Sequence, residues 1–267
     1  MIVFLLFRFP RKDMTPLHIR FQTVLILFLS GLLFLNGCSG SLLNPRKETP
    51  GELVQKAVTY IRVDNYIDAK AAVKEVLEDY PDSPERVIAS LLKAEIHYKE
   101  GEYEQSKYLF KAFLELYPAH RLADRASFFL AMSDFKLMDI ETRDQTSAQN
   151  ALEEFDKFLT EFPESKYRPQ ALIKKKECIA SLARNQMAIG KFYFRTSSFH
   201  SAINRFQQLL SAYPDQPFLD EVLFLLGESY YNEQNFDAAK TNYHHLIRKF
   251  PRSEFVKEAR VRLREIQ

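Results

Sequence analysis

The residues that can carry catalysis or bind a metal ion are few in this chain and lie far apart. The six histidines are His18, His97, His120, His200, His244 and His245. No two of them are four positions apart, the spacing that places two imidazoles on one face of a helix around a metal ion. The sequence also contains no phosphate-binding or dinucleotide-binding glycine motif and no nucleophile elbow. We therefore predict no catalytic residue, no metal ligand, no small-molecule substrate and no enzymatic activity.

One cysteine follows an N-terminal apolar segment. Residues 21–35 form an apolar run after Arg20, which is short for a membrane span and typical of an export signal. The run ends in Leu35-Asn36-Gly37-Cys38, which resembles the lipobox of bacterial lipoproteins. The resemblance implies a signal peptide over residues 1–37, cleavage before Cys38, and S-diacylglycerol and N-palmitoyl groups on that cysteine, with no other cofactor. The alternatives are an ordinary signal peptide or an anchor helix with a coincidental cysteine.

The segment after Cys38 predicts a tether that leads into a helical body. Residues 38–51 are polar and contain proline and glycine. Thr49-Pro50-Gly51-Glu52 has the pattern of a helix-capping box, and Ser83-Pro84 predicts a second helix start of the same kind. The first thirteen residues are unusual for an export signal, so translation from Met14 is an alternative start.

A short pattern occurs five times in the body of the chain. It consists of Leu or Ile, two further residues, an aromatic residue and proline. Its five copies, which mark five repeat units, end at Pro81, Pro118, Pro163, Pro214 and Pro251. The first and last intervals are 37 residues long, and the middle ones are longer, which indicates insertions. Twelve residues before each proline lies a small residue, and eight before it a larger apolar one: Ala69, Ser106, Ala151, Ala202 and Ala239, then Val73, Phe110, Phe155, Phe206 and Tyr243. This pattern resembles tetratricopeptide repeats, which are helix pairs that bury their apolar seams by stacking.

Composition supports an all-α chain and gives no reason to expect a nucleic-acid partner. The chain has 267 residues with only 7 glycines, and it shows no sustained alternation of polar and apolar residues. We predict a right-handed superhelix of five tetratricopeptide-like helix pairs, with a C-terminal capping helix over residues 253–266. Its seam-facing residues are predicted to be Phe255, Val256, Ala259, Val261 and Leu263. The net charge is +2, but residues 1–37 carry +3, so the rest of the chain is near neutral and gives no reason to expect a nucleic-acid partner.

A row of apolar residues is predicted on the concave face, where the first helices of such pairs lie. Twenty residues before each proline are Ile61, Tyr98, Phe194 and Tyr231, with Phe135 displaced by the insertion in unit three. Tyr60 lies one position before Ile61. These side chains either receive an extended peptide or pack between the helices, and the sequence leaves both interpretations open.

Three local motifs, in order along the chain, resemble the BamD family of lipoproteins of the outer-membrane β-barrel assembly machine. The first is Phe113-Leu114 with Tyr117-Pro118-Ala119-His120. The second is Arg143-Asp144-Gln145-Thr146 with the segment through Tyr167, in an inserted loop that we expect to be exposed. The third is Phe192-Tyr193 with Ser201-Ala202-Ile203-Asn204-Arg205. The resemblance covers most of the chain after Cys38, although Gln186 stands where the family usually has glutamate.

The resemblance implies a division of labour along the body. Residues 166–267 would bind the last POTRA domain of the barrel subunit BamA, with Asn204 and Arg205 at the contact. Residues 52–165 would form a groove for the C-terminal strands of unfolded outer-membrane proteins, with Tyr60, Ile61, Tyr98 and Phe135 as its lining. Accessory Bam lipoproteins would complete the complex. Ser39 after the cysteine, rather than aspartate, favours the outer membrane of a Gram-negative bacterium, with the body on the periplasmic side.

A different class of function remains open. Lipoproteins with tetratricopeptide repeats also act as periplasmic scaffolds for envelope division or peptidoglycan synthesis. Such proteins often carry an N-terminal coiled coil, and this chain has no heptad run, which disfavours that alternative.

Overall fold

The computed structural model describes residues 47–139 and 143–266. Eleven helices are found in these ranges, and no strand. They are α2 (Pro50–Arg62), α3 (Tyr66–Asp79), α4 (Glu85–Lys99), α5 (Tyr103–Leu116), α6 (Ala123–Lys136), α7 (Thr146–Glu161), α8 (Arg168–Arg195), α9 (Phe199–Ala212), α10 (Leu219–Asn232), α11 (Phe236–Lys249) and α12 (Val256–Glu265). The all-α prediction is confirmed for the described residues.

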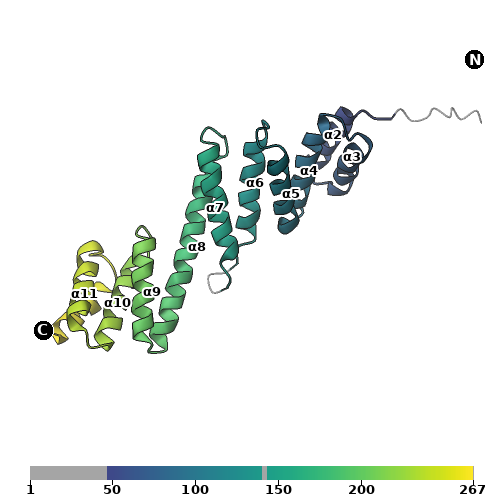
Figure 1. Cartoon of the computed structure of the whole chain (residues 1–267). Helices are drawn as coiled ribbons and strands as arrows, with labels where there is room; N and C mark the ends of the chain where they lie inside the picture. Colours follow the sequence, from purple (N-terminus) through teal and green to yellow (C-terminus); the bar gives the residue numbers. More distant parts are fainter. Residues whose placement is uncertain (1–46, 140–142, 267) are drawn as a thin grey trace, which may run out of the picture. The chain divides into compact units, whose positions relative to one another are not determined.

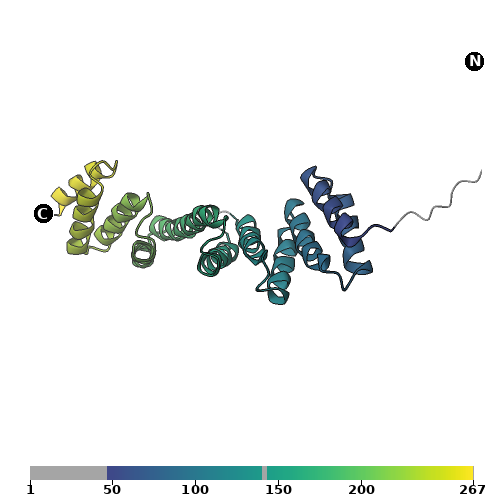
Figure 2. The ribbon, with the colours of Figure 1, turned by 90° about the horizontal axis from the view of Figure 1, so that it is seen from above.

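The helices form five consecutive antiparallel pairs followed by one last helix. Each helix packs on the next in the chain, and the first helices of neighbouring pairs also contact one another, as α2 contacts α4 and α8 contacts α10 (Figures 1 and 2). This arrangement confirms the predicted helical-repeat superhelix, with α12 packed on α11. In the described residues, no helix combines the length and the apolar character needed to cross a membrane.

The seam of each pair is formed by the residues that the repeat predicts. The small residues twelve positions before the prolines, from Ala69 to Ala239, are all fully buried. The larger residues eight positions before the prolines, from Val73 to Tyr243, are at most 2% exposed. A small side chain therefore lets each pair close, and a bulky one fills the seam.

Where the two helices of a pair cross, the first helix has alanine in units one to three and glycine in units four and five. Ala57, Ala94 and Ala131 are fully buried on α2, α4 and α6. Gly190 and Gly227 take this place on α8 and α10, where a methyl group would lie 2.5 Å from Cε1 of Phe206 and of Tyr243, respectively. Real Cβ atoms do not approach that closely, so these two rings rest directly on helix backbone.

The turn inside a pair has a left-handed residue in units one, two, four and five. These residues are Asp64, Gly101, Ser197 and Gln234, with φ of 56°, 82°, 57° and 60°. Gln234 directly precedes Asn235, which caps α11 by accepting a hydrogen bond from Ala238 N at 3.2 Å. Only Gly101 has the residue type that this backbone conformation prefers.

The two predicted helix starts have different outcomes. Thr49 and Glu52 form the expected capping box, because Glu52 N donates to Thr49 Oγ1 and Thr49 N donates to Glu52 Oε2. At Ser83-Pro84 the predicted helix start is confirmed, since α4 begins at Glu85, but the predicted cap by the Ser83 side chain is absent. Pro84 precedes α4, and Ser83 Oγ makes no hydrogen bond to a described residue.

The last helix closes the apolar end of the stack. Val256 and Ala259 are buried, and the ring of Phe255 stacks on Phe224 at 5.1 Å. Val261, which was predicted to face the stack, is 36% exposed. The predicted range of 253–266 was too long at its start, since α12 begins at Val256.

Candidate partner-binding surfaces

The predicted lipidation site lies outside the residues that the structure describes. Cys38 therefore stays a prediction. The other cysteine, Cys178, is fully buried in the seam around α6–α8, and burial raises the pKa of its thiol to about 12. A thiol in that environment stays protonated and acts as a packing group.

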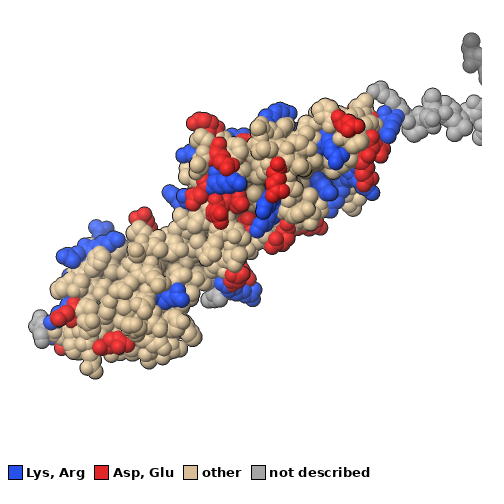
Figure 3. Space-filling model, in the orientation of Figure 1, with Lys and Arg blue, Asp and Glu red and all other residues tan. Residues whose placement is uncertain are grey.

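Helix α9 has a surface almost without charge. Arg205 is the one charged residue among its 14 residues, and the exposed side chains include Asn204, Gln207 and Gln208. On the face drawn in Figure 3, the part of the body around α9 and α10 is mainly uncharged, whereas charges crowd over the N-terminal helices. The centres of protein interfaces are likewise depleted of charge, with arginine as the exception.

Arg205 has amide partners in place of an acidic one. Its Nη1 lies 3.4 Å from Gln186 Oε1 and 3.5 Å from Gln208 Oε1, so both contacts are long and neutral. No carboxylate of the described residues forms an ion pair with it. The side chain is half-buried, which holds the guanidinium near the helix surface with its charge uncompensated.

The four residues predicted to line the client groove, which we call the client row, are half-buried and pack against the seams of units one to three. Tyr60 and Ile61 pack on the seam of α2–α4. Tyr98 makes edge contacts with Tyr103 and Phe129 at 5.5 and 5.1 Å, and burial raises the pKa of its hydroxyl to about 12. Phe135 contacts Phe155 at 6.4 Å and lies under Lys174 Nζ at 4.6 Å. Each ring exposes only part of its surface, so packing between helices accounts for much of the pattern.

The described residues of the inserted loop of unit three are only partly exposed. Arg143 and Asp144 are exposed as predicted, and Asp144 accepts hydrogen bonds from Thr146 N and Oγ1 at the start of α7. Gln145 contradicts the prediction, since it is 9% exposed and its amide donates to Arg143 O at 3.1 Å. Gln145 directly precedes α7, which begins at Thr146.

Residues from two of the motifs that resemble the BamD family line one hollow of about 590 Å³ beside α8. Arg143 of the inserted loop lines it, together with Lys191, Phe192, Tyr193 and Arg195 of α8. Phe192 is 53% exposed there. The sequence did not show that these motifs are neighbours, because they are about fifty residues apart in the chain.

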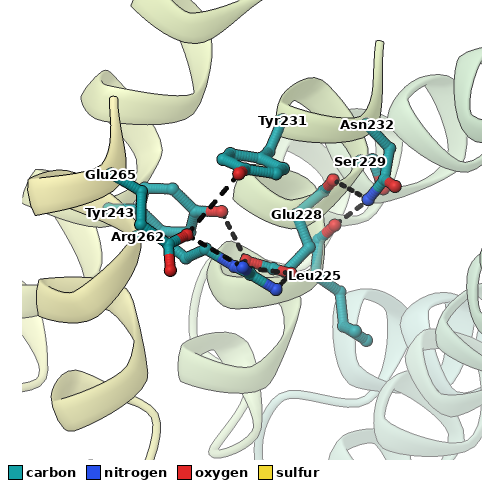
Figure 4. A network of polar contacts seen from close by, with 8 residues as sticks. All are labelled: Leu225, Glu228, Ser229, Tyr231, Asn232, Tyr243, Arg262 and Glu265. Atoms are coloured by element: carbon teal, nitrogen blue, oxygen red, sulfur yellow. Dashed lines mark hydrogen bonds and ion pairs between the residues drawn. The ribbon is translucent and has the colours of Figure 1, made fainter. Parts of the chain in front are cut away.

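The structure also contains buried charged groups that the sequence pattern did not indicate. Glu228 on α10 accepts from Arg262 Nε at 3.0 Å and from Tyr243 Oη at 2.5 Å, which joins α10, α11 and α12 (Figure 4). The guanidinium of Arg262 also lies 4.8 Å from the ring centre of Tyr231. The pattern of the last helix predicts lysine and arginine on its outer face, and it gives no sign that Arg262 turns inward.

Two further buried carboxylates join helices in the N-terminal half. Asp134 is 1% exposed and pairs with Lys107 at 2.6 Å, and Glu95 pairs with Arg125 at 2.5 Å. Burial raises the pKa of both carboxyls above the ordinary values, and the paired cations oppose that rise. These pairs hold neighbouring helices together and face no cleft with catalytic groups.

Within the described ranges, one trio of residues brings potential metal ligands close together. The ligand atoms of His97, Glu100 and Glu102 lie within 4.8 Å of one another at the turn between α4 and α5. Protein partners already occupy them, since His97 Nδ1 contacts Glu102 and Lys70 Nζ lies 2.5 Å from Glu100. The trio is a hydrogen-bonded and ion-paired cluster.

Comparison with known proteins agrees with this architecture. Residues 46–244 match the YfiO family model, described as an outer membrane lipoprotein. The chain is 29% identical over 204 residues to the outer membrane protein assembly factor BamD of Pasteurella multocida, covering 72% of this chain and 77% of the relative. It is 28% identical over 200 residues to BamD of Haemophilus influenzae, covering 71% and 76%.

Solved tetratricopeptide structures are more distant. The TPR2AB domain of yeast Sti1 matches 82% of this chain and 83% of its own, with 16% identity and a TM-score of 0.44. The assignment rests instead on the family model, which spans most of the helical body from before α2 into α11. The chain belongs to the YfiO family of outer membrane lipoproteins.

Proposed function

We propose that this protein is a lipid-anchored assembly factor for outer-membrane β-barrel proteins, bound to BamA on the periplasmic face of the outer membrane. The names of the curated relatives support the assembly function. Its work is binding, with no bond made or broken. Lipid on Cys38 would hold the body at the membrane, since several acyl chains give stable anchoring where one gives only marginal hold.

The observation that carries the docking proposal is the unpaired charge of Arg205 on the charge-poor surface of α9. A carboxylate of the last POTRA domain would replace the two long amide contacts with a charge-assisted, bidentate pair. The surrounding amide and hydroxyl side chains can be desolvated at lower cost than charges. Asn204 would lie at the same contact, because it is the exposed neighbour of Arg205.

The N-terminal units are proposed to receive client strands. A client strand that ends in an aromatic residue would stack on the exposed parts of Tyr60, Tyr98 and Phe135. Tyr60 also lines a hollow of about 550 Å³ beside Gly51, Gln55 and Thr59 on α2. Half-burial fixes the rings in place, so little side-chain entropy is lost when a strand binds.

The test is co-purification with BamA from detergent-solubilised envelopes at matched expression. The wild type should recover BamA, and Arg205→Glu should reduce recovery at least about tenfold, because a charge pair becomes a repulsion. Arg121→Glu, at an exposed arginine between α5 and α6, is the matched charge reversal outside the docking half, and it should recover BamA like the wild type. If Arg205→Glu behaved like Arg121→Glu, the docking surface would lie elsewhere. No recovery by the wild type, with both proteins present, would favour the periplasmic scaffold.

A further inference from the structure

A hollow of about 640 Å³ is lined by residues of α3, α4 and α5 and by none of the residues predicted to line the client groove. It runs over α4, between the second helices α3 and α5. The client row is carried by the first helices of the pairs, whereas this groove is bordered by second helices. It is therefore a separate surface, and we call it the α3–α5 groove.

The floor and one edge of the α3–α5 groove are apolar. Val73, Ile96 and Phe113 are buried residues that line its floor. Leu116 stands at the edge on the last turn of α5 and is 71% exposed. A hollow of this volume with an apolar floor and an exposed leucine has the properties of a binding groove.

The rim of the groove is strongly basic and only partly neutralised. Its charged members are Lys70, Lys74, Arg86 and Lys93, against a single carboxylate, Glu78. Lys70 pairs with Glu100, and Lys74 lies 3.8 Å from Glu78 with both side chains well exposed.

The other two cations of the rim have no acidic partner. Arg86 uses Nη1 to donate to the backbone carbonyl of Leu77 at 2.8 Å, which leaves its charge uncompensated. Lys93 is exposed, and no ion pair joins it to a described residue. The groove therefore combines an apolar floor with cations that lack carboxylates.

We propose that the α3–α5 groove binds an acidic amphipathic helix of a partner protein. The apolar face of such a helix would lie on the floor and against Leu116, and carboxylates on its flanks would pair with Arg86, Lys93 and Lys74. A helix fits because the groove is bordered by two helices, and ridges of side chains interlock with such a surface. The lining residues of α3, from Lys70 to Glu78, span roughly 12 Å, which corresponds to about two turns of a docked helix.

The test uses the full chain in detergent and fluorescent synthetic peptides, with anisotropy as the readout. The probe is an amphipathic helix of about 15 residues with leucines on one face and glutamates on both flanks. A matched peptide carries lysines in place of the glutamates, and another carries serines in place of the leucines. The glutamate peptide should bind, and both matched peptides should bind at least about tenfold more weakly.

Variants of the chain locate the site. Lys74→Glu combined with Lys93→Glu should weaken binding at least about tenfold, and Leu116→Asp should have a similar effect. The matched controls are Lys111→Glu and Ile67→Asp, which change exposed residues outside the groove, and both should bind like the wild type. All these substitutions lie on exposed side chains, and circular dichroism confirms that the variants are folded.

Three outcomes would overturn the proposal. The first is equal binding of the glutamate and lysine peptides, and the second is equal binding by groove variants and controls. The third is no binding of the glutamate peptide up to about 1 mM. In that last case, binding of myristate that is lost in the groove variants would identify a lipid site instead.

Discussion

The helix pairs of unit two (α4 and α5) and unit five (α10 and α11) are similar, but their glycine residues lie at different positions. In unit two, Gly101 lies in the turn and Ala94 at the crossing of α4 and α5. In unit five, Gln234 lies in the turn and Gly227 at the crossing of α10 and α11. Both turns have the same hydrogen bonds, with Gly101 N donating to Tyr98 O and Gln234 N to Tyr231 O.

The comparison of these two units shows which position requires glycine. In the turn, a residue other than glycine costs about 1 kcal/mol and leaves the geometry intact. At the crossing, the requirement comes from the partner side chain. The Tyr243 ring leaves no room for a methyl group on Gly227, whereas Phe110 packs beside Ala94. The glycine of unit five therefore fixes the position of Tyr243 and, through its hydroxyl, that of Glu228.

The largest expected effect is that of Gly227→Ala. The new methyl group would displace the fully buried Tyr243 ring, and we expect the free energy of unfolding to fall by about 2 to 3 kcal/mol despite the better helix propensity of alanine. Urea unfolding measures this. In a Tyr243→Val background, which imitates the Ala57–Val73 pair of unit one, Gly227→Ala should cost little. An equal loss in both backgrounds would show that the ring is not the cause.

The second effect concerns the cluster around Glu228. Arg262→Ala would leave the buried carboxylate with Tyr243 as its main partner, and we expect a loss of about 1 to 2 kcal/mol in unfolding free energy. Arg264→Ala removes a neighbouring exposed arginine of α12 and should change stability by less than about 0.5 kcal/mol. Equal losses in the two variants would mean that the cluster does not hold α12.

The third effect is a pH dependence of the free energy of unfolding, which comes from Asp134 in unit three. Units one, four and five have tyrosine at the equivalent position. Burial raises the pKa of Asp134, so the folded chain binds this proton at a higher pH than the unfolded chain. The carboxyl therefore weakens the folded state above its raised pKa, and this penalty disappears as the pH falls to the ordinary aspartate range.

The prediction is tested with Asp134→Asn, which does not titrate at this position. The stability of the wild type relative to this variant should rise as the pH falls from neutral toward the ordinary aspartate range. Glu115→Gln, an exposed substitution on α5, gives the baseline for the same interval. A relative stability that falls on acidification would contradict the direction of the pKa shift.

The smallest effects concern the turns. Gly101→Ala should lower the free energy of unfolding by about 1 kcal/mol, because alanine is strained at φ of 82°. Gln234→Gly should raise it by about 0.5 kcal/mol, since relief of the strained backbone slightly exceeds the entropy that glycine adds to the unfolded chain. Thermal unfolding detects both, and a destabilising Gln234→Gly would refute the equivalence of the two turns.

The sequence predicted what the repeat requires of every unit. Because five copies share the small and bulky seam positions, the buried residues from Ala69 to Tyr243 could be read from spacing alone. Features that belong to one unit were missed. Periodicity does not say that Arg262 bends toward Glu228, that Gln145 turns inward, or that Ser83 fails to cap α4. The sequence also did not reveal the α3–α5 groove, because its lining residues come from three helices and follow no single period.

We propose α9 as the docking surface for BamA, and crosslinking from equivalent positions of two units is a direct test of this proposal. Asn204 and Tyr108 both lie ten residues before the proline of their unit, and both are exposed. A photo-crosslinking amino acid at Asn204 should capture BamA in intact cells, and the same group at Tyr108 should not. Capture of BamA from Tyr108 but not from Asn204 would contradict the account.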